Sequence, residues 1–352
     1  SIGVIEGVAE STSAFLKIFS GVWSDRVRRR KPLVLIGYTL SGLARPMIGL
    51  ATVWPFVLAM RFADRVGKGL RTSPRDALIA DVTEPSIRGR AYGLHRAMDH
   101  AGAVVGPLVA AALMTAAGVP LRHVFLFAAV PAAVVVVILL AGVKEPASPA
   151  EKKREKISMA TGWRELGKEF KRLLLALFIF TLGNSTDAFL LLRLTDAGIG
   201  ASWVAVLWSL HHVVKMVSTY LGGCLSDRTS QRGMVIAGWI VYAAVYLSFA
   251  FVQSQKGLTT VFLLYGIYFG LTEPAEKAWV AGLVPERLRG TAFGCYHGMV
   301  GLAALPASLL FGLVWYAFSD AAAFVMGATL AVTAAFLLLL VHDQNTTRSA
   351  PE

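Results

Sequence analysis

The residues of this chain that could do chemistry are charged side chains inside apolar stretches. The densest group lies between residues 54 and 81 and consists of Arg61, Asp64, Arg65, Lys68, Arg71, Arg75 and Asp76. At 100° per residue, most of the cations share one face of a helix. Because each charge at mid-bilayer costs about 2.5 to 3.5 kcal/mol, this face is expected to line water or a polar cavity. Its surplus of positive charge predicts a solute with anionic groups.

Two further stretches supply polar groups that could complete a solute site. Residues 258–284 and 173–194 contribute them. The full predicted substrate-binding set is Arg61, Arg65, Lys68, Arg71, Asn184, Asp187, Glu273 and Glu276. The alternative is an internal salt-bridge lattice that gates without touching the solute, since structural ion pairs are common.

Carboxyl groups within the apolar stretches are candidate proton carriers, because burial favours their protonated form. The candidates are Glu6, Glu10, Asp64 and Asp99. Each could instead act as a counter-ion for the cations of residues 54–81. The sequence therefore predicts proton coupling but leaves the carrier open.

The sequence gives one weak indication of a metal. His95 with Met98, and His212 with Met216, have helical spacings that suit a soft transition metal. Because apolar helices are rich in methionine in any case, we predict no metal site and no cofactor. The chain also contains no nucleophile elbow, no His-Glu-x-x-His motif and no nucleotide-binding loop, so an enzyme is not expected.

Composition indicates the elements that carry these groups. Hydrophobic residues make up 55% of the chain, charged residues only 16%, and the mean hydropathy is +0.60, whereas soluble domains are about a quarter charged. A bilayer core needs roughly 20 apolar residues per helix, and the short alternating segments of a barrel are absent from the sequence. The sequence therefore predicts an all-α integral membrane protein. The expected helices are 1–22, 32–51, 54–81, 91–117, 123–143, 173–194, 201–225, 234–252, 258–284, 291–318 and 321–341.

Charge in the turns predicts the topology. Arginine and lysine gather in alternate turns, which assigns those turns to the cytoplasm of a plasma or bacterial inner membrane and explains the net charge of +12 without nucleic acid. The charged segment 144–172 is expected to be a cytoplasmic linker between helix bundles at 1–143 and 173–341, and residues 342–352 to be a cytoplasmic tail.

An internal repeat relates the two bundles. Gly21, Ser24, Asp25, Arg26 and Arg30 recur as Gly223, Ser226, Asp227, Arg228 and Arg232, at an offset of 202. Arg88-Gly89 recurs as Arg289-Gly290, at an offset of 201. The helix at 173–194 has no counterpart within the sequence, because its partner would precede residue 1. Eleven visible helices, with the first of twelve missing, are therefore expected.

The turn from Gly21 to Arg30 resembles the signature loop of the major facilitator superfamily, and Arg61 and Gly102-x-x-x-Gly106-Pro107 are also similar to family features. Arg28, where glycine is usual, and the spacing of Gly67 and Gly69 from Arg61 depart from the family pattern. The resemblance implies two pseudo-symmetric six-helix bundles and a conformational latch. Asp25, Arg29 and Asp81 would be the members of that latch.

The residue types in the turn from Gly21 to Arg30 also predict interactions without reference to the family. Asp25 can accept hydrogen bonds from Arg26, from Arg29 or from a nearby helix N-terminus. With the repeated pair, the predicted gating residues are Asp25, Arg26, Arg29, Asp81, Asp227 and Arg228. Alternatively, these arginines only set the membrane topology.

These observations predict a monomeric secondary active transporter that moves a small anionic or zwitterionic solute across the membrane by alternating access, coupled to protons. A drug/proton antiporter is the first alternative, because Gly102-x-x-x-Gly106-Pro107 resembles the antiporter motif. A transition-metal or siderophore importer, and a membrane-embedded enzyme or sensor, are the others. The direction of transport stays open.

Overall fold

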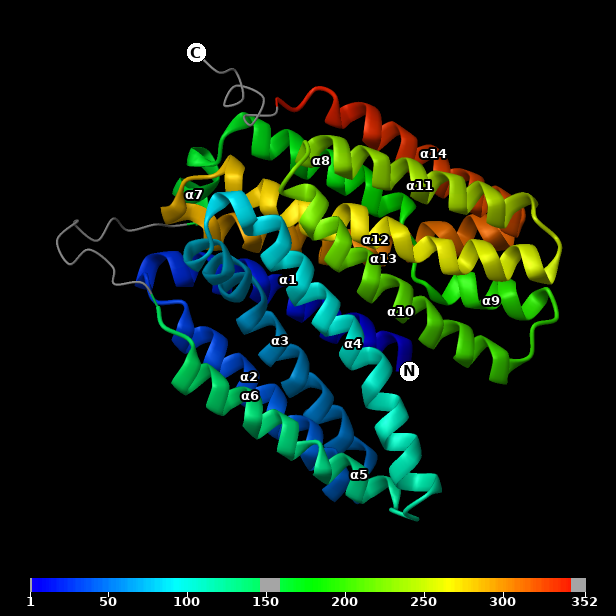
Figure 1. The fold of residues 1–352 in the computed structure, drawn as a ribbon, viewed down its shortest axis with the longest axis horizontal. Coiled ribbons are helices and arrows are strands. Elements are labelled where there is room, and N and C mark those ends of the chain that lie inside the picture. The colour runs from blue at the N-terminus through cyan, green and yellow to red at the C-terminus, as the bar shows by residue number, and fades with distance from the viewer. Residues whose placement is uncertain (1, 146–158, 343–352) are drawn as a thin grey trace. The chain divides into compact units, whose positions relative to one another are not determined.

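The computed structural model describes residues 2–145 and 159–342, and side chains from Thr12 onward. Every regular element in these ranges is a helix (Figure 1). The helices of the first half are α1 Ile2–Val27, α2 Lys31–Met47, α3 Trp54–Val82, α4 Arg88–Thr115, α5 Leu121–Phe127 and α6 Ala129–Gly142. Those that follow are α7 Met159–Glu165, α8 Lys168–Gly183, α9 Ala188–Asp196, α10 Ala201–Ser226, α11 Gln231–Phe251, α12 Gln255–Leu283, α13 Arg289–Ala317 and α14 Asp320–Leu338.

Helices occupy all eleven predicted ranges, but two of those ranges are broken. Residues 123–143 are divided between α5 and α6, and residues 173–194 between α8 and α9. In addition, α7 and the start of α8 lie inside the segment 144–172, so part of that segment is helical.

Seven helical stretches in the described ranges are long and apolar enough to cross a membrane. They are Lys31–Leu50, Pro85–Thr115, Leu121–Gly142, Lys168–Asp196, Gln231–Phe251, Glu286–Ala317 and Asp320–Leu338. The chain is therefore an integral membrane protein. Helices α1, α3, α10 and α12 are not among these stretches, and α3 carries the densest group of charges.

The chain forms two compact units, and each takes one segment from the other half of the sequence. The first unit comprises residues 1–82, 106–166 and 284–301, and the second comprises residues 83–105, 167–283 and 302–352. Helices α4 and α13 are thus shared between the units.

In the first unit, α3 packs against α1 and α2, and α2 also packs against α6 (Figure 1). In the second unit, α12 packs against α10 and α11, while α14 packs against α8 and α11. The second unit has an aromatic core, in which Phe180 stacks on Trp239 with ring centroids 4.6 Å apart. Burial of such large rings supplies much of the packing energy of this unit.

Candidate functional site

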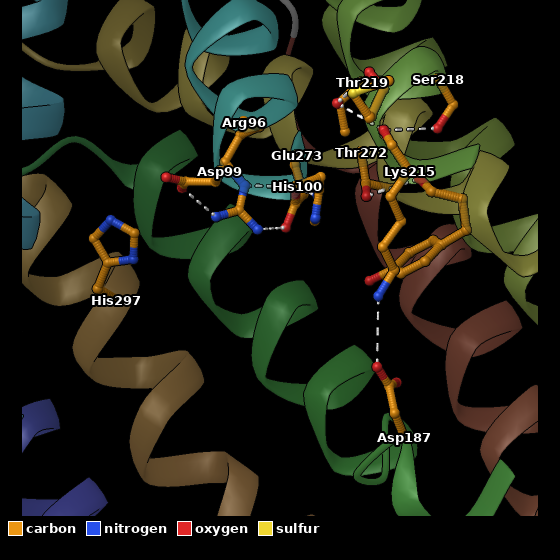
Figure 2. Close-up of polar contacts among 12 residues, drawn as sticks. Arg96, Asp99, His100, Asp187, Lys215, Ser218, Thr219, Thr272, Glu273 and His297 are labelled. Atoms are coloured by element: carbon orange, nitrogen blue, oxygen red, sulfur yellow. Dashed lines mark hydrogen bonds and ion pairs between the residues drawn. The ribbon is translucent and has the colours of Figure 1, made fainter. Parts of the chain in front are cut away.

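A charged cluster joins α4 and α12 in the second unit (Figure 2). Arg96 of α4 donates from Nε to Glu273 Oε2 over 2.7 Å and from Nη2 to Oε1. Arg96 also bonds Asp99 over 3.1 Å, and His100 Nε2 lies 3.6 Å from Glu273. The Arg96 and Glu273 pair is bidentate, which is the strongest geometry for a guanidinium and a carboxylate.

Lys215 of α10 is a buried cation next to this cluster, and the predicted site did not include it. Its side chain is 4% exposed, and its ammonium lies 3.5 Å from Asp187 Oδ2. The same ammonium lies 3.7 Å from the ring centroid of Phe269 and 5.7 Å from that of Trp208. One distant carboxylate and the faces of aromatic rings therefore stabilise the charge.

Two histidines of α10 line the same region. The ring of His212 lies 5.4 Å from that of His100 and 5.0 Å from that of Trp208, while His211 stacks on Tyr265 at 5.3 Å. Among the described residues, no group of three or more histidine, cysteine, aspartate or glutamate side chains could hold a metal ion. The pairing of His95 with Met98 and of His212 with Met216 thus gains no support as a metal site.

Tyrosine side chains form hydrogen bonds with the residues at the break between α8 and α9. Tyr242 donates to the carbonyl of Gly183 over 3.0 Å and lies 3.4 Å from Asn184 Oδ1. Tyr265 donates to Asp187 Oδ1 over 3.3 Å. Non-helical backbone at membrane depth needs such partners, and discontinuous helices often form transport sites. Asn184 is thus part of the framework of the break, whereas Asp187 faces Lys215.

The remaining predicted residue of α12 is Glu276, and it is buried beside Lys277, which the predicted set did not include. Glu276 and Lys277 are 6% and 5% exposed. The ammonium of Lys277 lies 5.7 Å from the ring of Tyr92, which belongs to α4 in the same unit. These two charges therefore lie within the second unit's own packing.

In the first unit, Arg71 of α3 faces α2. Its guanidinium lies 4.4 Å above the ring of Tyr38, and Nη1 donates to the carbonyl of Gly37 over 3.3 Å and to the hydroxyl of Ser41. Arg71 and Tyr38 line a groove of about 260 Å³ between α2, α3 and α6. Asp64, predicted as a proton carrier, accepts from Arg45 Nε over 3.1 Å at the edge of this groove.

The other predicted residues lie on α3, α1 and α4, and those of α3 and α4 differ in how far they are exposed. Arg61 is exposed, whereas Arg65 and Lys68 are half-buried. Glu6 and Glu10 lie on α1, but their side chains are outside the described part of the chain. Asp99, the remaining predicted proton carrier, has a 46% exposed side chain beside Arg96.

Asp76 of α3 forms a pair that the predicted site also lacked. His297 of α13 approaches it with Nε2 2.8 Å from Oδ2, and Arg75 Nη2 lies 2.9 Å from Oδ1. The Asp76 side chain is fully buried and that of His297 is 15% exposed. A buried aspartate is thus held between an arginine and a titratable imidazole.

Within the first unit, the turn from Gly21 to Arg30 bonds to the N-terminus of α13 through Asp25. We call this contact between an aspartate and a helix N-terminus a clasp. Asp25 accepts from the backbone nitrogens of Gly290 over 2.9 Å and Thr291 over 2.6 Å, and from the Thr291 hydroxyl over 2.8 Å. The helix N-terminus was among the predicted partners of Asp25. A carboxylate there satisfies orphan amides and complements the helix dipole.

The arginine of this clasp is Arg30, and neither Arg26 nor Arg29 takes that place. Arg30 Nη2 lies 3.3 Å from Asp25 Oδ1, and its Nε lies 2.8 Å from Asp81 Oδ2. Arg289 Nη1 approaches Asp81 from the other side at 2.9 Å. Asp25 and Asp81 therefore belong to one network, whereas Arg26 and Arg29 are exposed.

The repeat builds the same clasp a second time, within the second unit. Asp227 accepts from the backbone nitrogens of Gly89 over 2.6 Å and Arg90 over 2.9 Å, at the start of α4. Gly282 stands where the first copy has Asp81, so no carboxylate occupies that position. Arg228 is exposed. The second clasp therefore lacks the carboxylate that Asp81 supplies to the first.

Buried charges, a broken helix and two copies of one clasp define an integral membrane protein that holds polar groups inside an apolar helix bundle. The family model described as Major Facilitator Superfamily matches residues 1–271 and 189–352. The chain therefore belongs to the major facilitator superfamily, and it is a transporter rather than an enzyme.

Three similar proteins illustrate this membership. An MFS-type transporter of Methanocaldococcus jannaschii is 35% identical, and the aligned region covers 97% of this chain and 86% of that transporter. The multidrug resistance protein MdtH of Baumannia cicadellinicola is 25% identical and covers 83% of this chain and 70% of its own. The crystal structure of the human organic anion transporter MFSD10 has the same fold, with a TM-score of 0.79, 19% identity and coverage of 95% and 83%.

Proposed function

We propose that the protein is a proton-coupled secondary active transporter of a small solute that carries an anionic group. The observation that carries this proposal is Lys215, a buried ammonium 3.5 Å from its only carboxylate partner in the described residues. An ammonium has three donors, and one long contact leaves capacity for a solute carboxylate or phosphate. Aromatic rings around Lys215 would receive the apolar part of that solute.

The helix charges support the same proposal. Arg96 belongs to the charged cluster next to Lys215 in the second unit, and its side chain is 25% exposed. In the first unit, Arg61, Arg65 and Lys68 give α3 a basic character that attracts anions. Together with Arg71, Asn184, Asp187, Glu273 and Glu276, these residues are our proposed solute-binding set, to which Lys215 and Arg96 are added.

The duplicated architecture supports a cycle of alternating access. We place eleven helices across a plasma or bacterial inner membrane, grouped as bundles 1–143 and 173–341, with the linker 144–172 and the tail 342–352 in the cytoplasm. The clasps at Asp25 and Asp227 act as gates that break and re-form in each cycle. A single chain is sufficient for this cycle, and Glu6, Glu10, Asp64 and Asp99 are proposed proton carriers.

Drug/proton antiport is the second candidate, and one observation favours it. The 25% identical relative from Baumannia cicadellinicola bears the name of a multidrug resistance protein. An exporter of this kind would accept cationic or neutral amphiphiles, for which the aromatic rings near Lys215 also offer contacts. The charge of the transported solute separates the two candidates.

A proton-flux assay tests both candidates. Liposomes loaded with a pH-sensitive dye and reconstituted with the full chain are exposed to benzoate, succinate or ethidium. We expect the anions to drive proton movement, Lys215→Gln to abolish it, and Lys256→Gln, at an exposed lysine, to leave it unchanged. A response to ethidium alone would favour the antiporter, and no response to any solute in the panel would contradict proton-coupled transport of anions.

A further inference from the structure

The repeat places two different side chains at equivalent positions on α4 and α13. Residues 96 and 297 are separated by the 201-residue offset that relates Arg88-Gly89 to Arg289-Gly290. In the second unit Arg96 bonds Glu273 of α12, and in the first unit His297 bonds Asp76 of α3 (2.8 Å). Each pair ties a shared helix to the charged helix of its unit, but only one of the two cations can lose its proton near neutral pH.

The surroundings of His297 favour a proton-dependent interaction. Asp76 is fully buried, so its charge is costly without a cationic partner. The charged groups on the elements packed against α13 include Asp76 and Arg75 on α3, and Lys17 and Asp25 on α1, of which Asp25 accepts from the first backbone nitrogens of α13. On its own helix, His297 meets the rings of Phe293 and Tyr296.

We infer that His297 and Asp76 form a proton-binding site of this transporter, in which one proton held on the imidazole ties α13 to α3. Protonated His297 makes an ion pair with the Asp76 carboxylate. When the proton leaves, a neutral hydrogen bond replaces that pair, and Asp76 keeps its contact with Arg75. The packed arrangement of α13 on α3 is therefore stabilised at low pH and weakened at high pH. The link to coupled transport rests on the proposed function.

The chain contains a native reporter for this site. Cys295 lies two residues before His297 on α13 and is 6% exposed, so its reaction with N-ethylmaleimide requires α13 to move away from its neighbours. The other cysteine, Cys224, is replaced by alanine in the parent chain and in every variant compared with it. Labelling rates are measured between pH 5.5 and pH 8 for the full chain in lipid nanodiscs, without solute or gradient.

The comparison variant is His297→Arg, which carries a fixed positive charge like its counterpart Arg96. Dividing the parent rate by the variant rate at each pH removes the pH dependence of the thiol chemistry. We expect this ratio to rise about tenfold from pH 5.5 to pH 8, because a hydrogen bond to a charged group typically contributes that much. The variant His123→Gln, at an exposed histidine of α5, should behave like the parent.

A constant ratio across the pH range would overturn the inference. If His297→Arg fails the size-exclusion test for folding, His297→Gln replaces it, and the parent should then label about ten times more slowly than this variant at pH 5.5 and equally fast at pH 8. The labelling needs no solute. A rise of the labelling ratio with pH, without proton flux in liposomes, therefore supports the site and contradicts the proposed function. Proton flux together with a labelling ratio that does not change with pH contradicts the site alone.

Discussion

Asp25 accepts hydrogen bonds from both the backbone nitrogen of Thr291, over 2.6 Å, and its hydroxyl, over 2.8 Å. The two residues are 266 positions apart in the chain. With Arg30, Asp81 and Arg289 the contact forms a largely buried network, whereas in the repeat Asp227 accepts from two backbone amides. The two clasps are therefore unequal, and their difference can be measured.

Asp25→Asn should destabilise the protein more than Asp227→Asn does. The first change removes a buried charge that faces Arg30 and three donors, and hydrogen bonds to charged groups contribute about 1.5 to 3 kcal/mol. The second change removes two contacts at a more exposed carboxylate. Thermal unfolding of both variants in detergent measures the difference, and a larger loss for Asp227→Asn would contradict this ranking of the clasps.

Gly290→Ala should be destabilising, whereas Gly102→Ala should be harmless. A Cβ at Gly290 would lie 2.6 Å from Asp25 Oδ1 and 2.5 Å from the carbonyl oxygen of Gly21, but one at Gly102 would meet no heavy atom within 4 Å. Overpacking costs typically 1 to 3 kcal/mol, while alanine favours a helix over glycine by about 1 kcal/mol. Yield and melting temperature report both effects. Equal behaviour of the two variants would refute the close crossing of α1 and α13.

Arg96→Gln should cost more stability than the double change of Arg96→Gln with Glu273→Gln. The single change leaves the half-buried Glu273 carboxylate without its bidentate partner, and hydrogen bonds to charged groups contribute about 1.5 to 3 kcal/mol. The second change removes the unpaired charge. A double-mutant cycle from unfolding curves gives the coupling energy, which would be near zero if the pair were only incidental.

Asp187→Asn should lower the melting temperature and make it sensitive to anions. The change leaves the buried Lys215 ammonium without a carboxylate, so benzoate is expected to restore several degrees in this variant and less in the parent chain. Asp196→Asn, at an exposed aspartate of α9, is the matched control. If benzoate shifts both variants equally, Lys215 does not attract anions in the way we propose.

Much of the fold could be predicted from local pattern. Apolar stretches located the helices, and the repeat of Gly21 and Asp25 at Gly223 and Asp227 indicated two equivalent turns. The close approaches explain the repeated glycines, because Gly89 and Gly223 contact each other's backbone in the second unit as Gly21 and Gly290 do in the first. Periodicity could not reveal the break at residues 184–187, because tyrosines from α11 and α12 hold it open.

The partners of the charged groups were harder to predict. A helix N-terminus was one of three partners that the sequence allowed for Asp25, with Arg26 and Arg29 as the others. The arginine beside Asp25 is Arg30, and spacing along the turn does not distinguish Arg29 from Arg30. His297 is a single histidine in an apolar helix and its partner Asp76 is 221 residues away. The equivalence of His297 with Arg96 is visible in the sequence, and it is the signal that could have identified this position.

The exchange of segments between the units also affects how the protein is made. Gly290 and Asp25 are separated by 265 residues, and ribosomes add about 5 to 20 residues per second. Asp25 must therefore wait roughly 13 to 50 seconds after its own synthesis before α13 can satisfy it. During that interval the Asp25 carboxylate lacks the backbone amides of α13 that it accepts from in the folded protein, so the first half completes this network only after translation of the second half is well advanced.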